Sequence, residues 1–199
     1  MSNFILKNPD CVFIHIKKTG GSSIRKGLWR ENYEGPFFGY IPEKGQDLFK
    51  FAFVRNPVSR FLSAYKMFAY GTSHVRKLTN YPKIALDDFS KIVFNNSIPN
   101  KFGKDSTHNE RIKHHTSPQT DPINCLHMAD YVARYENYDN EIRYLCQILK
   151  KNILFIPRRN VTVSRTLDLN DRLCTQIFDF YEQDFKRLNY SLDKKNYLP

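Results

Sequence analysis

A strand that runs directly into a glycine-containing loop and then a helix is the feature of this sequence that most restricts its fold. Residues 12–16 form the apolar run Val-Phe-Ile-His-Ile, which predicts a buried strand. Two lysines, a threonine, two glycines and two serines follow within 17–23. Ile24 and Leu28 lie four residues apart, which predicts a helix over 22–31. Loop amides and a helix N-terminus in this order can face an anion, so the sequence predicts a site for a phosphate or sulfate group.

The order of residues in this loop differs from two common nucleotide-binding patterns. A Walker A loop has its lysine after the glycines, followed by a hydroxyl residue for magnesium, whereas Lys18 precedes Gly20 and Gly21. The dinucleotide-binding pattern requires a third glycine. A Gly-Gly pair also occurs in ordinary turns, so these residues alone leave a purely structural turn open.

A second stretch, residues 51–65, repeats the order of strand, turn and helix. Residues 51–54 are apolar, Arg55 follows them, and an Asn-Pro turn precedes a helix predicted over 58–69. The planar guanidinium of Arg55 and the hydroxyl of Ser63 both suit a phosphate ligand. The alternative is that Arg55 forms a surface ion pair and Ser63 has no ligand.

Together, these stretches resemble the nucleotide-binding motifs of sulfotransferases that use 3′-phosphoadenosine 5′-phosphosulfate. Residues 13–23 are similar to the family's 5′-phosphosulfate loop, and residues 51–65 to its 3′-phosphate motif. The likeness is closest to the carbohydrate branch, which includes heparan sulfate 2-O-sulfotransferase. Lys17 and Ser22 depart from the family pattern, which has Pro and Thr at these positions. The resemblance continues at residues 115–119, 131–137 and 181–185.

The resemblance implies roles for individual residues. Lys18 is expected to be catalytic, because a lysine at this position contacts the bridging oxygen and stabilises the leaving phosphate. Arg55 and Ser63 are expected to bind the 3′-phosphate. Arg165 is expected to help cover the nucleotide, although a solvated surface arginine is the alternative. The residues expected to bind the 5′-phosphosulfate group are Lys17, Lys18, Thr19, Gly20, Gly21, Ser22 and Ser23.

The general base that accepts the proton of the acceptor hydroxyl is less clear from the sequence. Relatives often place a histidine or glutamate between the two motifs, but residues 25–50 contain no histidine. We prefer His115, which lies in a segment that resembles a family active-site segment, and place Glu43 next. The other candidates between the motifs are Glu31, Glu34 and Tyr40.

Length and composition fit one domain over residues 1–199. The net charge of +11 favours an anionic partner, but the basic residues are scattered, so nucleic acid is not predicted.

No apolar run approaches the roughly 20 residues of a membrane-spanning helix, and the N-terminus lacks a signal peptide, so we expect a cytoplasmic protein. The four cysteines form no Cys-x-x-Cys pair and are expected to be reduced and mostly buried. We also expect no metal ion, since cationic side chains and amides supply the positive charge that sulfuryl transfer requires.

Alternating strands and helices predict an α/β fold, a single domain with a central parallel sheet flanked by helices. The resemblance implies that its glycine loop is a P-loop-like phosphosulfate loop. Lys18 and Arg55 would then lie at the carboxyl ends of strands, where such folds bind ligands. Strands are predicted at 11–16, 51–54, 131–135 and 153–156, with a weaker one at 36–41. Helices are predicted at 22–31, 58–69, 86–95, 107–115, 138–151 and 169–188.

The function expected from the resemblance is transfer of a sulfuryl group from 3′-phosphoadenosine 5′-phosphosulfate to a hydroxyl of a carbohydrate, with 3′-phosphoadenosine 5′-phosphate as the product. One alternative is a nucleotide or small-molecule kinase, which requires magnesium and a Walker lysine. Another is a non-catalytic protein that binds a nucleotide or polyanion, which the missing histidine between the motifs keeps open.

Overall fold

The computed structural model describes residues 2–70, 83–101, 103–156 and 169–197. The chain divides into two compact units, each of which is described by itself. The first unit comprises residues 1–55 and 119–161, and the second comprises residues 56–118 and 162–199. The prediction of a single domain stays a prediction. None of the helices within the described ranges is both long and apolar enough to cross a membrane.

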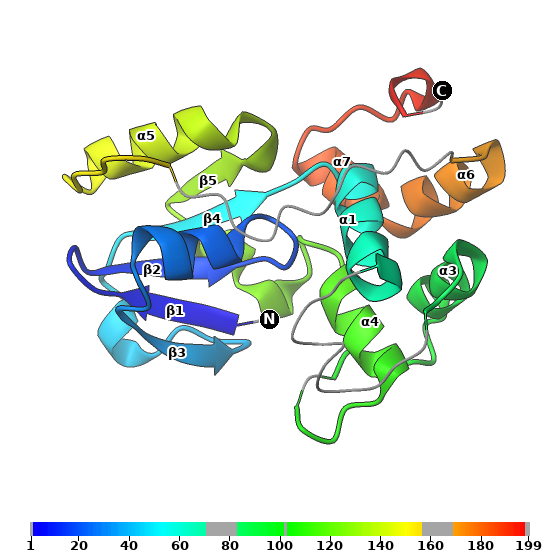
Figure 1. Ribbon diagram of the computed structural model, residues 1–199, viewed down its shortest axis with the longest axis horizontal. Helices are drawn as coiled ribbons and strands as arrows, with labels where there is room; N and C mark the ends of the chain where they lie inside the picture. Colours follow the sequence, from blue (N-terminus) through cyan, green and yellow to red (C-terminus); the bar gives the residue numbers. More distant parts are fainter. Residues whose placement is uncertain (1, 71–82, 102, 157–168, 198–199) are drawn as a thin grey trace. The chain divides into compact units, whose positions relative to one another are not determined.

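The first unit contains a five-stranded sheet in the order β3-β1-β2-β4-β5 (Figure 1). β2 pairs parallel with β4, and β4 pairs parallel with β5. β1 pairs antiparallel with both β2 and β3. The predicted α/β class is therefore confirmed, but the sheet is mixed rather than wholly parallel. The strands are β1 (Ser2–Leu6), β2 (Cys11–His15), β3 (Tyr33–Phe38), β4 (Lys50–Val54) and β5 (Tyr131–Arg134).

Three strands differ from the sequence prediction, and one of them is only shifted, since the strand expected at 36–41 is β3 (Tyr33–Phe38). β1 was missed because Ser2 and Asn3 leave it only three consecutive apolar residues, yet all five of its residues are buried. Backbone pairing with β2 and β3 does not depend on side-chain polarity, and Asn3 donates from Nδ2 to the Tyr40 carbonyl at 2.9 Å. The strand predicted at 153–156 is wrong, since these residues form no regular element and Leu154 is 98% exposed. An apolar run alone does not establish burial.

Helices of the first unit cover one face of its sheet. The helix predicted over 22–31 is a short π-helix, η1 (Ser23–Leu28), in which the Trp29 N–H donates to the Ile24 carbonyl at 3.0 Å. The prediction for 138–151 is confirmed by α5 (Tyr138–Ile148). Side chains of η1 and α5 share one apolar cluster with the strands, which includes Ile24, Leu28, Phe13, Phe51, Phe53, Ile142 and Leu145. The opposite face meets η2 (Glu43–Gly45), where Gly45 packs against Ile41 and Val12.

The second unit is helical. Its core is an aromatic and aliphatic cluster that includes Phe61, Phe68 and Phe89. The single helix predicted over 169–188 is two helices that break at Tyr181, whose φ of −104° and ψ of 21° depart from helical values. The α-helices in the described part of this unit are α1 (Pro57–Tyr70), α3 (Leu86–Phe94), α4 (His108–Thr116), α6 (Asp171–Phe180) and α7 (Glu182–Arg187).

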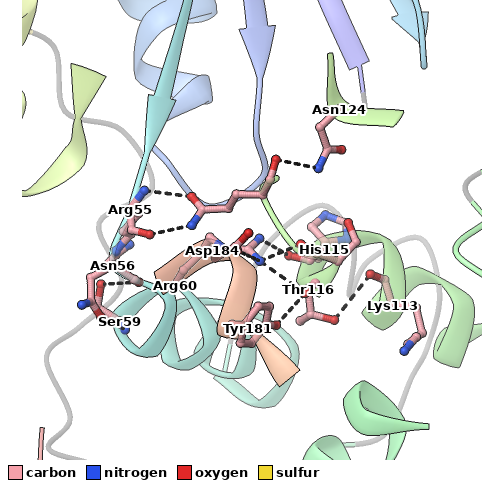
Figure 2. Close-up of polar contacts among 12 residues, drawn as sticks. Arg55, Asn56, Ser59, Arg60, Lys113, His115, Thr116, Asn124, Tyr181 and Asp184 are labelled. Carbon is pink, nitrogen blue, oxygen red and sulfur yellow. Dashed lines mark hydrogen bonds and ion pairs between the residues drawn. The ribbon is translucent and has the colours of Figure 1, made fainter. Parts of the chain in front are cut away.

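A buried arginine holds the C-terminal end of α4. The Arg60 guanidinium donates to the carbonyls of Thr116 at 3.3 Å and Ser117 at 2.6 Å (Figure 2). It also lies 4.0 Å from the Asp184 carboxylate, and both side chains are at most 1% exposed. Tyr181, where the two last helices meet, donates its hydroxyl to the same Thr116 carbonyl at 2.5 Å. A cation is favoured here because the last carbonyls of a helix carry partial negative charge.

We expect Arg60→Leu to lower the free energy of unfolding by about 3–5 kcal/mol, because it leaves the Asp184 carboxylate buried without its cation. Urea unfolding of the purified variant measures this change. The control is Lys186→Met, which removes an exposed ion pair with Glu182 in the same unit and should change stability little. Equal effects of the two variants would contradict the role given to Arg60.

Candidate functional site

The loop between β2 and η1 has the predicted order of strand, glycine loop and helix. The Thr19 hydroxyl donates to the Ile16 carbonyl at 2.8 Å, which closes the turn after β2. The Ser23 N–H donates to the Gly20 carbonyl at 2.9 Å, which starts the helical turn. Ser22 lies directly before η1, at its N-cap position. The loop is therefore held by its own hydrogen bonds, with Lys17 and Lys18 at its start.

Both loop glycines are required by their surroundings. Gly20 has a φ of +88°, a conformation that favours glycine, and a Cβ there would lie 3.0 Å from the Tyr138 ring. A Cβ on Gly21 would lie 2.1 Å from Nε2 of His15. His15 is buried and stacks on Phe13 with ring centroids 5.3 Å apart, so its ring has little room to move. His15 is thus a core residue, with Nδ1 3.4 Å from Ser2 Oγ, and its ring lies directly beneath the loop.

The two lysines of the loop carry destabilised charges. Burial, together with the nearby Arg25 and Lys18 cations, lowers the pKa of Lys17 to about 8. Burial, together with the Arg55 cation, lowers the pKa of Lys18 to about 8. Lys17 also donates from Nζ to Ser2 Oγ at 3.2 Å, which ties it to β1. Because an anion would favour the charged form of each lysine, the loop is electrostatically suited to a polyanionic ligand.

The structure brings Arg55 to this loop. Arg55 directly follows β4, and its Nη1 donates to the Lys18 carbonyl at 3.3 Å. Its guanidinium lies over the Tyr135 ring, 4.4 Å from the centroid, in a cation–π contact. Lys18 has a φ of +70°, in the left-handed region, and its carbonyl accepts from the arginine. Three cations from two neighbouring strand ends thus gather at one edge of the sheet, and their set fits a ligand with several negative charges.

The remaining predicted site residues belong to other parts of the chain. Ser63 is half-buried on α1 and His115 is half-buried on α4, both in the second unit. That these two residues share a ligand with Lys18 and Arg55 stays a prediction. Arg165 lies outside the described residues. Glu43 is an exposed residue of η2, in the first unit.

The hydrogen bonding of His115 determines its chemistry. Nδ1 lies 2.8 Å from the carbonyl of Arg111, one turn earlier in α4. A carbonyl only accepts, so Nδ1 carries the proton and the lone pair of the neutral ring is on Nε2. The Phe68 ring packs edge-on against the imidazole at a centroid distance of 5.5 Å, which helps to fix its orientation. His115 can therefore accept a proton at a defined atom.

Sequence reasoning assigned no role to two residues that the structure makes prominent. Arg60 lies five positions after Arg55 in the same motif, but it is buried against protein atoms. Gln119 pairs with the Arg55 backbone through its side-chain amide. Both residues were part of the stretches that carry the family resemblance, but a sequence pattern does not distinguish a ligand contact from a structural one.

Metal-binding side chains do not cluster in the part of the chain that the structure describes, where no group of three or more His, Cys, Asp or Glu residues is placed to hold an ion. The four cysteines are free and buried, as expected. They are Cys11, Cys125, Cys146 and Cys174.

Comparison with known proteins identifies the family. A family model described as the sulfotransferase family matches residues 26–191. This span contains Arg55, Ser63 and His115 and begins after the loop of residues 17–23. No curated protein and no solved structure matches the chain. Since the match covers most of the 199 residues, the chain belongs to the sulfotransferase family.

Proposed function

We propose that this sulfotransferase takes its sulfuryl group from 3′-phosphoadenosine 5′-phosphosulfate and transfers it to a carbohydrate hydroxyl. The observation that carries the donor assignment is the meeting of Arg55 with the loop lysines. The residues that resemble the 3′-phosphate motif and those that resemble the 5′-phosphosulfate loop join through the hydrogen bond from Arg55 to the Lys18 carbonyl. The carbohydrate acceptor rests on the resemblance to the carbohydrate branch of the family.

The donor nucleotide, when bound, supplies a sulfuryl group attached to a phosphate that can leave. Lys18 would hold its ammonium near the bridging oxygen and offset the negative charge that develops there. Lys17, Thr19, Gly20, Gly21, Ser22 and Ser23 would bind the 5′ end. Arg55 and Ser63, with Arg165 as a covering residue, would bind the 3′ end.

His115 is the proposed general base. Its Nε2 would accept the proton of the acceptor hydroxyl as the new oxygen–sulfur bond forms. The phosphate–sulfate bond breaks in the same displacement, with attacking and leaving oxygens in line. Side-chain cations and loop amides supply the positive charge, so the proposal includes no metal ion.

A nucleotide-binding test separates the proposed function from the kinase alternative. We expect 3′-phosphoadenosine 5′-phosphate to stabilise the protein without magnesium, by about 2.7 kcal/mol at 100 times its dissociation constant. Lys18→Ala and Arg55→Ala should each weaken its binding by about tenfold or more, since each removes a charge-assisted hydrogen bond. Thermal shift and calorimetric titration measure these effects.

The matched control for these variants is Lys26→Ala, which removes an exposed cation of η1 that pairs with Glu31. Its nucleotide affinity should equal that of the parent. Stabilisation by ATP with magnesium, but not by the 3′,5′-bisphosphate, would favour a kinase. Unchanged binding by the Lys18 and Arg55 variants would show that the nucleotide lies elsewhere.

Nucleotide affinity should depend on pH through the loop lysines. Their pKa values of about 8 in the free protein should rise when phosphates bind, because an anion favours the ammonium form. Affinity is therefore fully present below pH 8 and falls above it, by up to about tenfold per pH unit for each lysine. Calorimetric titration between pH 7 and 10, in buffers of different ionisation enthalpy, measures both the affinity and the proton uptake. The Lys17→Arg/Lys18→Arg double variant keeps its charge throughout this range, so its affinity should stay flat. A parent affinity that does not change with pH would contradict this assignment.

Substitution of the base should affect turnover and not nucleotide binding. We expect His115→Asn to lower the rate of sulfuryl transfer by about 10²–10⁴-fold, because the variant lacks the base that takes the proton of the substrate hydroxyl. A radiolabelled sulfate-transfer assay over a panel of glycans and small alcohols measures this rate and identifies the acceptor. Glu43→Gln is the comparison, and a larger loss in that variant would assign the base to Glu43. Nucleotide binding without transfer to any acceptor would favour the non-catalytic alternative.

A further inference from the structure

The side chain of Gln119 pairs with both backbone polar groups of Arg55, as a neighbouring strand would. Its Oε1 accepts from the Arg55 N–H at 2.9 Å, and its Nε2 donates to the Arg55 carbonyl at 2.8 Å (Figure 2). The ladder between β4 and β5 ends with Val54 opposite Arg134, so Arg55 lies one residue beyond it. The amide of Gln119 therefore extends strand-like hydrogen bonding to the residue where the sheet stops.

Gln119 is itself firmly held. It is fully buried, with 0% of its surface exposed. Its own carbonyl accepts from Nδ2 of Asn124, the last residue of η3 (Pro122–Asn124), at 3.1 Å. Rotation of the Gln119 amide by 180° would place its NH₂ against the Arg55 N–H and its oxygen against the Arg55 carbonyl, so one orientation is strongly preferred. A buried residue with a determined amide orientation is a rigid support.

The orientation of Arg55 determines what its guanidinium can bind. A small rotation of the backbone at the end of a strand is amplified along the four bonds of an arginine side chain. The guanidinium lies over Tyr135 and donates to Lys18, so it is already directed towards the loop. Bidentate binding of a phosphate is stronger when the planar fork is aligned before the ligand arrives, since alignment on binding costs side-chain entropy.

We propose that Gln119 is a positioning residue that fixes the backbone of Arg55 and thereby sets the preference of this site for a 3′-phosphorylated nucleotide. This inference rests on the proposed function. Gln119 acts through Arg55 and not by touching the ligand. Its removal should therefore weaken recognition of the 3′-phosphate and spare the 5′ end, which the loop lysines hold.

The test compares two nucleotides that differ only in the 3′-phosphate. Adenosine 5′-phosphate and 3′-phosphoadenosine 5′-phosphate are titrated calorimetrically into the parent and into Gln119→Met, which keeps side-chain length but forms no amide hydrogen bonds. We expect the variant to bind the bisphosphate about tenfold more weakly, with its affinity for the monophosphate unchanged within about twofold. In an Arg55→Ala background, Gln119→Met should have no further effect on either nucleotide.

Two other variants separate positioning from a general loss of structure. Gln46→Met removes a hydrogen bond of 2.7 Å from the Gln46 side-chain amide to the Ile41 carbonyl, which lies in the same unit. This variant should leave the preference for the bisphosphate unchanged. When its carboxyl group is ionised, Gln119→Glu still accepts from the Arg55 N–H but cannot donate to the Arg55 carbonyl, and it should then show the same selective loss. It replaces Gln119→Met if that variant does not fold, as judged by circular dichroism.

The outcomes distinguish this inference from the proposed function. A parent that binds both nucleotides equally would overturn the 3′-phosphate assignment to Arg55 and the inference with it. A parent that prefers the bisphosphate, with the preference intact in the Gln119 variants, overturns the inference alone. Equal weakening of both nucleotides, or an undiminished effect in the Arg55→Ala background, would show that Gln119 does not act through Arg55.

Discussion

The parallel pairing of β2 with β4 is the constraint on which the rest of the candidate site depends. It places the carboxyl ends of two strands at one edge of the sheet, and the residue pairs Val12–Lys50 and Ile14–Ala52 set their register. Lys18 follows one strand and Arg55 follows the other, so the register brings two cations together. The antiparallel strand β1 also contacts the loop, since the hydroxyl of its Ser2 accepts a hydrogen bond from Lys17. Without the parallel pair, the two motifs would be separate turns.

The same convergence makes the free site electrostatically unfavourable. Burial and mutual repulsion lower the pKa of both lysines, so each charge costs stability in the folded chain that it does not cost in the unfolded chain. The backbone contributes further strain through the left-handed Lys18. A polyanion would relieve the repulsion on binding. The buried core of the unit, which includes Phe13 and Phe51, offsets this destabilisation.

The sequence alone predicted those elements in which apolar pattern and burial coincide. The fully buried β2 and the amphipathic α1 were predicted closely, and so was the order of strand, glycine loop and helix between β2 and η1. The missed β1 contains polar residues that backbone pairing tolerates, and the false strand at 153–156 has an apolar pattern without burial. The meeting of Arg55 with Lys18 followed from the expected parallel order. The roles of Arg60 and Gln119 did not, because they depend on contacts with residues more than fifty positions away.

Arg55 and Arg60 show how far a motif determines chemistry. The two residues are identical, belong to one stretch and lie five positions apart. Arg60 is 1% exposed and its guanidinium is directed at the carbonyls that end α4 and at Asp184, so it cannot reach a ligand without loss of that support. Arg55 is only half-buried, with its backbone fixed and its side chain at the loop. The surroundings of the two arginines therefore differ although the motif is one: protein carbonyls hold the Arg60 side chain, whereas Arg55 lies at the end of β4 with its side chain at the loop lysines.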